Sequence, residues 1–457
     1  MRVSIVMLAM LQLVAAAAAQ PDQGAENQRL MLSNIRIFDV GTGQMMPAQN
    51  IIIEGSTISF VGKIWDAPFR GREIDCRGKF AVPGLFDSHI HMTELTRHGD
   101  DSLQSILKAF VERGVMQVRD VGGSIDVVSE MARRIETGEI IGPEMFYTGP
   151  MLEKSPMLWE GVNDTFPDFT AAINTIEDVD SLLPTLAEQG ARLVKTFNKC
   201  DSTVYGHLVE VARQLSLKIV HDPGTPLFHW IPMDKAIEMG VTSIEHAKAP
   251  WPVVLSDDLK EEHDRLIGPD ADQAACRMFM TKVAAMGTES ISLERLGQLA
   301  ARMTENEVYL CPTLNVLESM EENALEATRN GMGIDTLPEQ VEQMIKTSVA
   351  GMAAVSRYFV TELSRTRVKM FVGQDGYDPS ATFTEMQLMN DCGVSAAEII
   401  KGATIYPAEW LGVSYRLGSI MPGKQANILV VDANPLEDIG NLEQTFLVIK
   451  SGSVIYP

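Results

Sequence analysis

Short apolar runs alternate with longer helix-like stretches between residues 81 and 406, and this alternation constrains the fold more than any other feature of the sequence. The longer stretches space their apolar residues near 3.6, as amphipathic helices do, and the short runs are typical of buried strands. Repeated strand-then-helix units imply a parallel sheet, and eight such units imply a closed (β/α)8 TIM barrel in an α/β protein. The predicted strands are Ala81–Asp87, Val115–Val121, Met145–Thr148, Leu193–Phe197, Lys218–His221, Thr242–His246, Val308–Thr313 and Lys369–Gly373. The clearest predicted helices are Leu103–Arg113, Ile125–Thr137, Val179–Gln189 and Val204–Leu215.

Strand-rich segments flank this region on both sides. We therefore expect a small composite β-sandwich domain built from both chain ends, residues 29–80 and 411–457, around a barrel at residues 81–410. Its predicted strands are Leu30–Asp39, Asn50–Glu54, Thr57–Lys63, Glu73–Cys76, Ser419–Met421, Ile428–Asp432, Phe446–Lys450 and Ser453–Tyr456. The segment Ala249–Glu307 is longer than a barrel helix needs, and it is either a helical excursion that roofs the site or a plain helical insertion.

The N-terminus and the overall composition predict an exported soluble protein. Residues 1–19 resemble a secretory signal with a cleavage site near Ala19, and the polar residues 20–28 read as a disordered lead-in. Export predicts a secreted or periplasmic protein without membrane contact after signal removal, and an uncleaved N-terminal anchor is the alternative. With 38 basic and 61 acidic residues the net charge is −23 at pH 7, which argues against nucleic acid as a partner.

The cysteines form no recognisable pattern. Five of them are scattered along the chain, an odd number without any Cys-x-x-Cys pair, so we expect buried free thiols rather than a disulfide framework.

Metal-ligand residue types stand at the ends of five predicted strands. An isolated His-x-His such as His89 and His91 more often has no function, but further candidates stand where later strands end. In a barrel the carboxyl ends of all strands meet at one face, so these side chains should converge. Neutral imidazoles and a carboxylate suit zinc and similar divalent ions, and a carboxylate can also transfer protons. The six candidate ligands are His89, His91, Lys195, His221, His246 and Asp375.

Lys195 is the unusual member of this set. A free ammonium would repel a metal ion, so Lys195 would have to be neutral or converted. Reaction with carbon dioxide would give a carbamate, an anion able to bridge two cations. Taken alone, Lys195 would more often be an ion-pairing lysine of the barrel than a metal ligand. The five other candidate ligands make the metal-ligand interpretation the favoured one.

The series resembles the amidohydrolase superfamily, in particular its imidazolonepropionase-like and Xaa-Pro dipeptidase-like branch of metal-dependent hydrolases. The likeness covers nearly all of the chain after the signal. The segments that carry it are Pro83-Gly84-Leu85-Phe86-Asp87-Ser88-His89-Ile90-His91, Gly190-Ala191-Arg192-Leu193-Val194-Lys195, Ser243-Ile244-Glu245-His246, Gly373-Gln374-Asp375, Leu417-Gly418-Ser419-Ile420 and Pro422-Gly423-Lys424-Gln425-Ala426-Asn427.

The resemblance implies a binuclear centre with two divalent metal ions, for which zinc is the expected metal. It implies that His89, His91 and Asp375 bind one ion, that His221 and His246 bind the other, and that N6-carboxylated Lys195 bridges them together with a hydroxide. Asp375 would take the proton from the attacking water and pass it to the leaving group. Two departures stand out: Asp222-Pro223-Gly224 follows His221 in place of the common His-Ala-x-Gly pattern, and Asn427 replaces the usual aspartate.

The predicted function is hydrolysis of a C–N amide bond in a dipeptide, an N-acyl amino acid or a cyclic amide. The alternatives are a mononuclear deaminase of the same superfamily, which would carry a glutamate where this chain has Gly224, and a non-catalytic binding protein on the same barrel. The expected partner is a small-molecule substrate, and a homo-oligomer is left open. We expect the residues that contact the substrate to lie on loops near the strand ends. The candidates are Arg119, Trp159, His229 and Tyr377, and for Arg119 a structural ion pair with Asp120 or another acid is the alternative.

Overall fold

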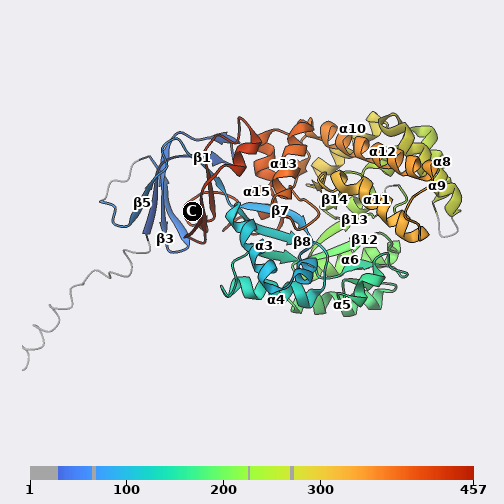
Figure 1. Cartoon of the computed structure of the whole chain (residues 1–457), viewed down its shortest axis with the longest axis horizontal. Coiled ribbons are helices and arrows are strands. Elements are labelled where there is room, and N and C mark those ends of the chain that lie inside the picture. Colours follow the sequence, from blue (N-terminus) through green and yellow to red (C-terminus); the bar gives the residue numbers. More distant parts are fainter. Residues whose placement is uncertain (1–28, 64–67, 225–226, 268–271, 457) are drawn as a thin grey trace, which may run out of the picture.

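A computed structural model describes residues 29–63, 68–224, 227–267 and 272–456 (Figure 1). The predicted signal and lead-in, residues 1–28, lie outside these described residues. In Figure 1 a sheet formed by both chain ends stands at one side, the parallel strands occupy the centre, and a group of helices that includes α8 and α9 lies at the far side. Within the described residues, no helix combines the length and the apolar character that crossing a membrane requires. All five cysteines are buried and free, as predicted.

The sheet at the chain ends contains nine strands and mixes the two termini. Its main order is β19-β18-β17-β6-β1-β3-β4, and β2 and β5 also pair with β1. The N-terminal strands are β1 (Arg29–Asp39), β2 (Gln44–Met45), β3 (Gln49–Glu54), β4 (Thr57–Gly62), β5 (Arg72–Asp75) and β6 (Phe80–Pro83), and the C-terminal ones are β17 (Ile428–Val431), β18 (Thr445–Lys450) and β19 (Ser453–Tyr456). Antiparallel pairing of β6 with β17 joins the two ends.

The prediction of a strand at Ser419–Met421 is wrong. Gly418 adopts a φ of 81°, and Pro422 follows the segment, so three residues between two chain breakers cannot extend into a strand.

The central strands form two parallel sheets. One has the order β7-β8-β9 and the other β11-β10-β12-β13-β14-β15-β16, and every neighbouring pair is parallel. The strands are β7 (Leu85–Ile90), β8 (Val115–Asp120), β9 (Glu144–Tyr147), β10 (Met151–Glu153), β11 (Thr170–Ala172), β12 (Leu193–Phe197), β13 (Lys218–Asp222), β14 (Ser243–Glu245), β15 (Tyr309–Cys311) and β16 (Lys369–Met370). The predicted parallel α/β character is confirmed.

The first predicted central strand, Ala81–Asp87, is divided at Gly84 into β6 and β7, which belong to different sheets. A Cβ at Gly84 would lie 2.7 Å from Met116 Sδ and 3.0 Å from Asn427 Cβ, so only glycine lets the chain pass here from one sheet to the other.

Backbone hydrogen bonds connect both edges of the three-stranded sheet to the seven-stranded sheet. Ser88 N donates to Val372 O at 2.7 Å and Asp375 N donates to His89 O at 2.8 Å, which ties β7 to the segment after β16. On the other side Arg192 N donates to Tyr147 O at 3.2 Å, between β9 and the start of β12.

The helices that follow the early strands lie where the apolar spacing predicted them. They are α3 (Asp100–Glu112), α4 (Ile125–Glu136), α5 (Ile176–Glu188) and α6 (Ser202–Gln214). Further helices, not predicted individually, are α7 (Met233–Glu238) and, after β16, α13 (Ala381–Asp391), α14 (Ala396–Gly402) and α15 (Ile405–Trp410). Buried side chains of the helices and strands form the main apolar core, and a second cluster, including Phe86, Leu193, Val220, Tyr309 and Phe371, fills the space enclosed by the strands.

The long segment Ala249–Glu307 is helical, as predicted. It contains α8 (Asp257–Leu266), α9 (Gln273–Met286) and α10 (Leu293–Glu305). Two long helices, α11 (Val316–Met332) and α12 (Glu339–Ser364), precede β16 and were not predicted individually. The backbones of α9 and α12 approach closely, because a Cβ at Gly351 would lie 2.0 Å from Ala284 O.

Candidate metal centre

His89 and His91, at the end of β7, both face one carboxylate. His89 Nε2 lies 3.5 Å and His91 Nε2 lies 3.2 Å from Asp375 Oδ1. The opposite nitrogen of each ring is engaged: His89 Nδ1 lies 2.7 Å from Glu245 Oε2 and His91 Nδ1 lies 3.0 Å from Gly122 O. Because a carboxylate and a carbonyl only accept, each Nδ1 carries the proton in the neutral ring and each Nε2 presents a lone pair toward Asp375.

His246 approaches the same carboxylate from the end of β14. Its Nδ1 lies 3.8 Å from Asp375 Oδ2, and its Nε2 lies 2.8 Å from Asp222 Oδ2. Thr313 Oγ1 lies 2.7 Å from His246 Nδ1 and also has Pro312 O as an acceptor at 2.8 Å. His89, His246 and Asp375 thus form a group whose potential ligand atoms all lie within 4.8 Å of one another.

Unusual backbone conformations place the residues at these strand ends. Asp375 has a φ of 58° and His246 a φ of 70°, and Thr313 has a φ of 51°. Left-handed backbone is unfavourable for residues with a side chain, and it concentrates at functional sites where the surrounding structure enforces it. These turns direct His246 and Asp375 toward His89.

The ionisation of His89 and Asp375 favours a neutral imidazole beside a charged carboxylate. Burial lowers the pKa of His89 to about 4, and the nearby Lys195 lowers it further while Asp375 raises it. Burial alone would raise the pKa of the Asp375 carboxyl, but the facing histidines hold it well below its usual value. Neutral nitrogen and ionised oxygen are the forms that bind a divalent cation.

The site contains one buried imidazole nitrogen without a hydrogen bond. His89 is 0% exposed, and its Nε2 has no hydrogen-bond partner among the described residues. A buried polar atom is rarely left this way unless an ion or water belongs beside it. Nitrogens of three histidines and a carboxylate around this atom suit a divalent ion such as zinc, so the residues fit the group that the sequence predicted.

Lys195 lies beside the cluster rather than inside it. The side chain is 1% exposed, and its Nζ lies 3.0 Å from Asp222 Oδ2, the same oxygen that lies against His246. Burial alone would raise the pKa of the Asp222 carboxyl, but His246 and Lys195 hold it well below its usual value. Asp222 was not among the predicted site residues, although it follows His221 directly.

The structure does not bring His221 to the cluster, which differs from the sequence-based expectation. His221 Nε2 lies 3.1 Å from Ile231 O, so it donates there, and its Nδ1 accepts from the Tyr205 hydroxyl at 2.9 Å or from Thr196 Oγ1 at 3.1 Å. The physical reason is the alternation of side chains along β13. Asp222 faces Lys195, so the neighbouring His221 must face the helices.

Arg119 is a structural residue of the strand interior rather than an exposed substrate contact. It is 0% exposed, and it donates to Ser88 O at 2.7 Å, to Ser243 Oγ at 3.1 Å and to Glu245 Oε1 at 2.9 Å. This corrects the substrate role and matches the stated alternative of a structural ion pair, with Glu245 as the acid. Glu245 in turn holds His89, so Arg119 acts on the site through that carboxylate.

The other three substrate candidates occupy different surroundings. Trp159 is 48% exposed and precedes a short 3-10 helix at Glu160–Asp164. His229 is buried, and the Tyr377 ring lies 6.0 Å from the His98 ring. Within the described part of the chain, no hydrogen bond links Trp159 or Tyr377 to the cluster around Asp375.

Sequence reasoning missed Glu245 and Asp222, and one available signal could have found both. Each directly neighbours a histidine that was predicted as a metal ligand, because Glu245 precedes His246 and Asp222 follows His221. Counting every second residue back from the strand end would have placed Asp222 on the same face as Val220, which fills the strand interior.

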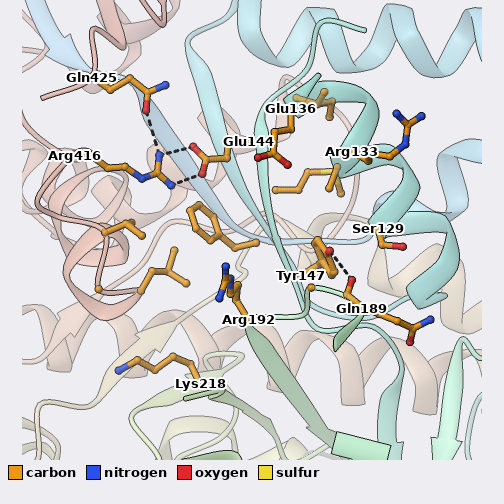
Figure 2. A pocket seen from close by; sticks show the side chains of 18 of the residues that line it. Ser129, Arg133, Glu136, Glu144, Tyr147, Gln189, Arg192, Lys218, Arg416 and Gln425 are labelled. Atoms are coloured by element: carbon orange, nitrogen blue, oxygen red, sulfur yellow. Dashed lines mark hydrogen bonds and ion pairs between the residues drawn. The ribbon is translucent and has the colours of Figure 1, made fainter. Parts of the chain in front are cut away.

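A large cavity lies elsewhere among the described residues (Figure 2). It measures about 1210 Å³ and is lined by Glu144 and Lys218, the first residues of β9 and β13, and by Arg192 and Arg416. Arg416 Nη1 lies 2.9 Å from Glu144 Oε2. Because parallel strands share one direction, this cavity is at the amino ends of the strands, opposite to the cluster. A large pocket is the default choice for a binding site, but the cluster has the chemistry and this cavity holds none of its residues.

Parallel strands with a His and Asp cluster at their carboxyl ends define an α/β protein with a candidate divalent-metal site. The model of the Amidohydrolase family matches residues 279–455. This match covers the C-terminal part of the chain, and the solved structures described next are similar to the chain in fold. Members of this family typically bind divalent metals.

Solved structures of similar fold cover almost the whole chain. A Xaa-Pro dipeptidase with bound methionine has a TM-score of 0.67 at 21% identity, over 93% of this chain and 99% of that one. Molinate hydrolase has a TM-score of 0.68 at 16% identity, over 94% of each chain. Ochratoxinase of A. niger has a TM-score of 0.66 at 16% identity, over 93% of this chain and 95% of that one. At these identities the likeness concerns the fold.

Curated relatives match only short stretches. An adenine deaminase of Shewanella halifaxensis is 36% identical over 67 residues, 15% of this chain and 11% of the relative. A deacetylase of Agrobacterium fabrum is 30% identical over 96 residues, 21% of this chain and 23% of the relative. The chain thus aligns with about a tenth of the length of the first of these relatives.

Proposed function

We propose that this chain is a metal-dependent hydrolase of C–N amide bonds. The observation that carries the proposal is the convergence of His89, His91 and His246 on Asp375, around a buried nitrogen that lacks a hydrogen bond. The match of residues 279–455 to the Amidohydrolase family model and the hydrolases among the structures of similar fold support it.

A divalent ion held by these residues, most simply zinc, would polarise the scissile carbonyl and make water a better nucleophile. The chain supplies the remaining steps. Asp375 accepts the proton of the attacking water on a carboxylate oxygen and delivers it to the leaving nitrogen. Glu245 fixes the orientation of the His89 ring, and Arg119 holds Glu245.

The substrate class we propose is a dipeptide, an N-acyl amino acid or a cyclic amide. The neighbours that support it are a Xaa-Pro dipeptidase and a putative prolidase from Bifidobacterium longum. Deamination of a nucleobase is the second candidate, and it is favoured only by the short matches to adenine deaminases.

For the architecture we propose a closed (β/α)8 barrel at residues 81–410 and a composite β-sandwich domain from residues 29–80 and 411–457. Hydrogen bonds at both edges of the parallel sheets support closure, and the pairing of β6 with β17 supports the composite domain. We further propose export to the periplasm or the cell exterior, on the basis of residues 1–19 alone.

The experiment is a hydrolysis screen with the metal-loaded protein on a library of dipeptides, N-acyl amino acids and lactams, with adenine deamination measured in parallel. Asp375→Asn should keep the fold and lower kcat by about 10²–10⁴-fold, because general acid–base groups contribute that much. Asp391→Asn, an exposed aspartate on α13, is the matched control and should leave kcat unchanged. Ammonia release from adenine without amide hydrolysis would replace the proposed amide hydrolase with a deaminase. Near-normal turnover in Asp375→Asn would exclude Asp375 as the group that transfers the proton.

A further inference from the structure

The register between β12 and β13 decides which residue of strand β13 faces the site. Lys195 pairs with Val220, Thr196 with His221, and Phe197 with Asp222. Paired residues of neighbouring parallel strands point to the same side, and residues two apart on a strand share that side. Lys195 and Asp222 therefore share the interior face, and His221 occupies the opposite one.

Packing on the two faces agrees with this assignment. Val220 belongs to the apolar cluster enclosed by the strands, whereas Ile219 belongs to the core between strands and helices. His221 follows Ile219 by two residues and meets Tyr205 of α6. A single side-chain rotation cannot exchange Asp222 and His221, because their positions are set by the backbone.

Asp222 gives Lys195 an ionic partner inside the protein. Lys195 Nζ lies 3.0 Å from Asp222 Oδ2, and the two side chains are 1% and 4% exposed. Forming a carbamate requires the neutral amine to attack carbon dioxide and release a proton. A carbamate at this position would place a second anion against Asp222 and leave both groups buried without a counter-ion.

Asp222 also completes a pattern shared by the three histidines. Each has one ring nitrogen donating to an acceptor, namely Glu245 for His89, Gly122 O for His91 and Asp222 for His246. The other nitrogen of each ring lies on the side of Asp375. The nitrogens on this side of the three rings thus face Asp375, although His246 Nδ1 also lies 2.7 Å from Thr313 Oγ1.

From these observations we propose that the chain binds one divalent ion, between His89, His91, His246 and Asp375, and that the Lys195–Asp222 ion pair stands where the sequence predicted a second ion. Asp222 is a positioning residue that orients His246 and forms the buried ion pair with Lys195. The inference rests on the proposed function, since it concerns the same metal site, and it replaces the two-ion arrangement with carboxylated Lys195.

The test is the metal content per chain after loading the full-length protein with zinc and bicarbonate, measured by elemental analysis, together with a ¹³C NMR spectrum in ¹³C-bicarbonate. The wild-type protein should bind one ion and show no lysine carbamate signal. Asp222→His should free Lys195, so that variant should bind a second ion and show the carbamate signal. His221→Gln is the matched control and should still bind one ion.

Each other outcome is decisive. Two ions or a carbamate signal in the wild-type protein would overturn the inference, as would loss of the ion in His221→Gln. An Asp222→His variant that folds and stays at one ion would also contradict it, because Asp222 would then not be what excludes the second ion. If Asp222→His does not fold, the wild-type and His221→Gln results still decide. No ion in the wild-type protein would refute the proposed function itself.

Discussion

At the scale of single residues, the candidate metal centre depends on the residues that bind the ligand side chains on the side away from the metal position. Glu245 connects His89 to Arg119, and all three side chains are fully buried. The Arg119 guanidinium also lies over the Phe371 and Trp410 rings, at 4.7 and 4.8 Å. The ion pair therefore sits in an apolar environment, where breaking it leaves an uncompensated charge.

Glu245→Gln tests this chain of contacts. The variant keeps the size of the side chain but removes the charge, so the free energy of unfolding should fall by about 3–5 kcal/mol because Arg119 remains buried without a counter-ion. Zinc affinity should fall by about 10–100-fold, because His89 loses its orienting carboxylate. Denaturant unfolding and competition with a chelator measure the two effects. Glu130→Gln, which breaks an exposed pair with Arg133, should change stability by less than about 0.5 kcal/mol; an equal loss in both variants would contradict the account.

His221 gives a prediction for pH dependence. Burial lowers its pKa in the folded protein from 6.5 to about 4, and both ring nitrogens are already bonded in the neutral form. Between these two values the unfolded chain binds more protons, so stability rises with pH across that window and falls as the medium is acidified toward pH 4. The contribution amounts to about 3 kcal/mol at most.

His221→Gln removes this contribution. The difference in unfolding free energy between neutral pH and roughly pH 5 should be smaller in His221→Gln than in the wild-type protein, as chemical denaturation at both pH values would show. An unchanged difference would mean that His221 is not held neutral in the folded state.

At the scale of elements, the sequence predicted most of the strands and the early helices. It did not predict on which side of its strand every residue lies. The 3.6-residue periodicity identified α3 to α6, and the short apolar runs identified β7 to β9 and β12 to β16, to within a few residues, whereas β10 and β11 were not predicted. They could not fix the register between β12 and β13, because hydrogen bonding between strands is not encoded in either strand alone. A shift of one residue exchanges Asp222 for His221.

Helix packing supplies a prediction at this scale. A Cβ at Gly351 in α12 would meet Ala284 O of α9 at 2.0 Å, so Gly351→Ala should separate the two helices and lower stability by about 1–3 kcal/mol. Gly297, inside α10, has open space around it, so Gly297→Ala should raise stability by up to about 1 kcal/mol through helix propensity. Thermal unfolding of both variants distinguishes them, and the same sign for both would contradict the close approach.

At the scale of the whole molecule, the two chain ends are part of one sheet. β6 leads into β7 across Gly84, and Gly84 N donates to Asn427 O at 2.8 Å, so the composite sheet and the first ligand strand are directly connected. The sequence indicated this arrangement because strand-rich segments flank the alternating region. It could not indicate the strand order, which depends on pairings more than 300 residues apart, such as Ile428 with Pro83.

The metal site is also a property of the whole molecule, because its residues come from strands distributed along the chain. Four of the six predicted ligands converge, namely His89, His91, His246 and Asp375. Lys195 lies beside them through Asp222, and His221 faces away. Residue types and strand ends were sufficient to select the region, whereas side-chain direction required the folded backbone.

The most direct measurement is a crystal structure of the zinc-loaded protein with anomalous scattering data at the zinc edge. The account predicts one anomalous peak among His89, His91, His246 and Asp375, and an unmodified Lys195 against Asp222. Two peaks bridged by a carboxylated Lys195 would contradict the single-ion site, and no peak at these residues would contradict the proposal of a metal-dependent hydrolase.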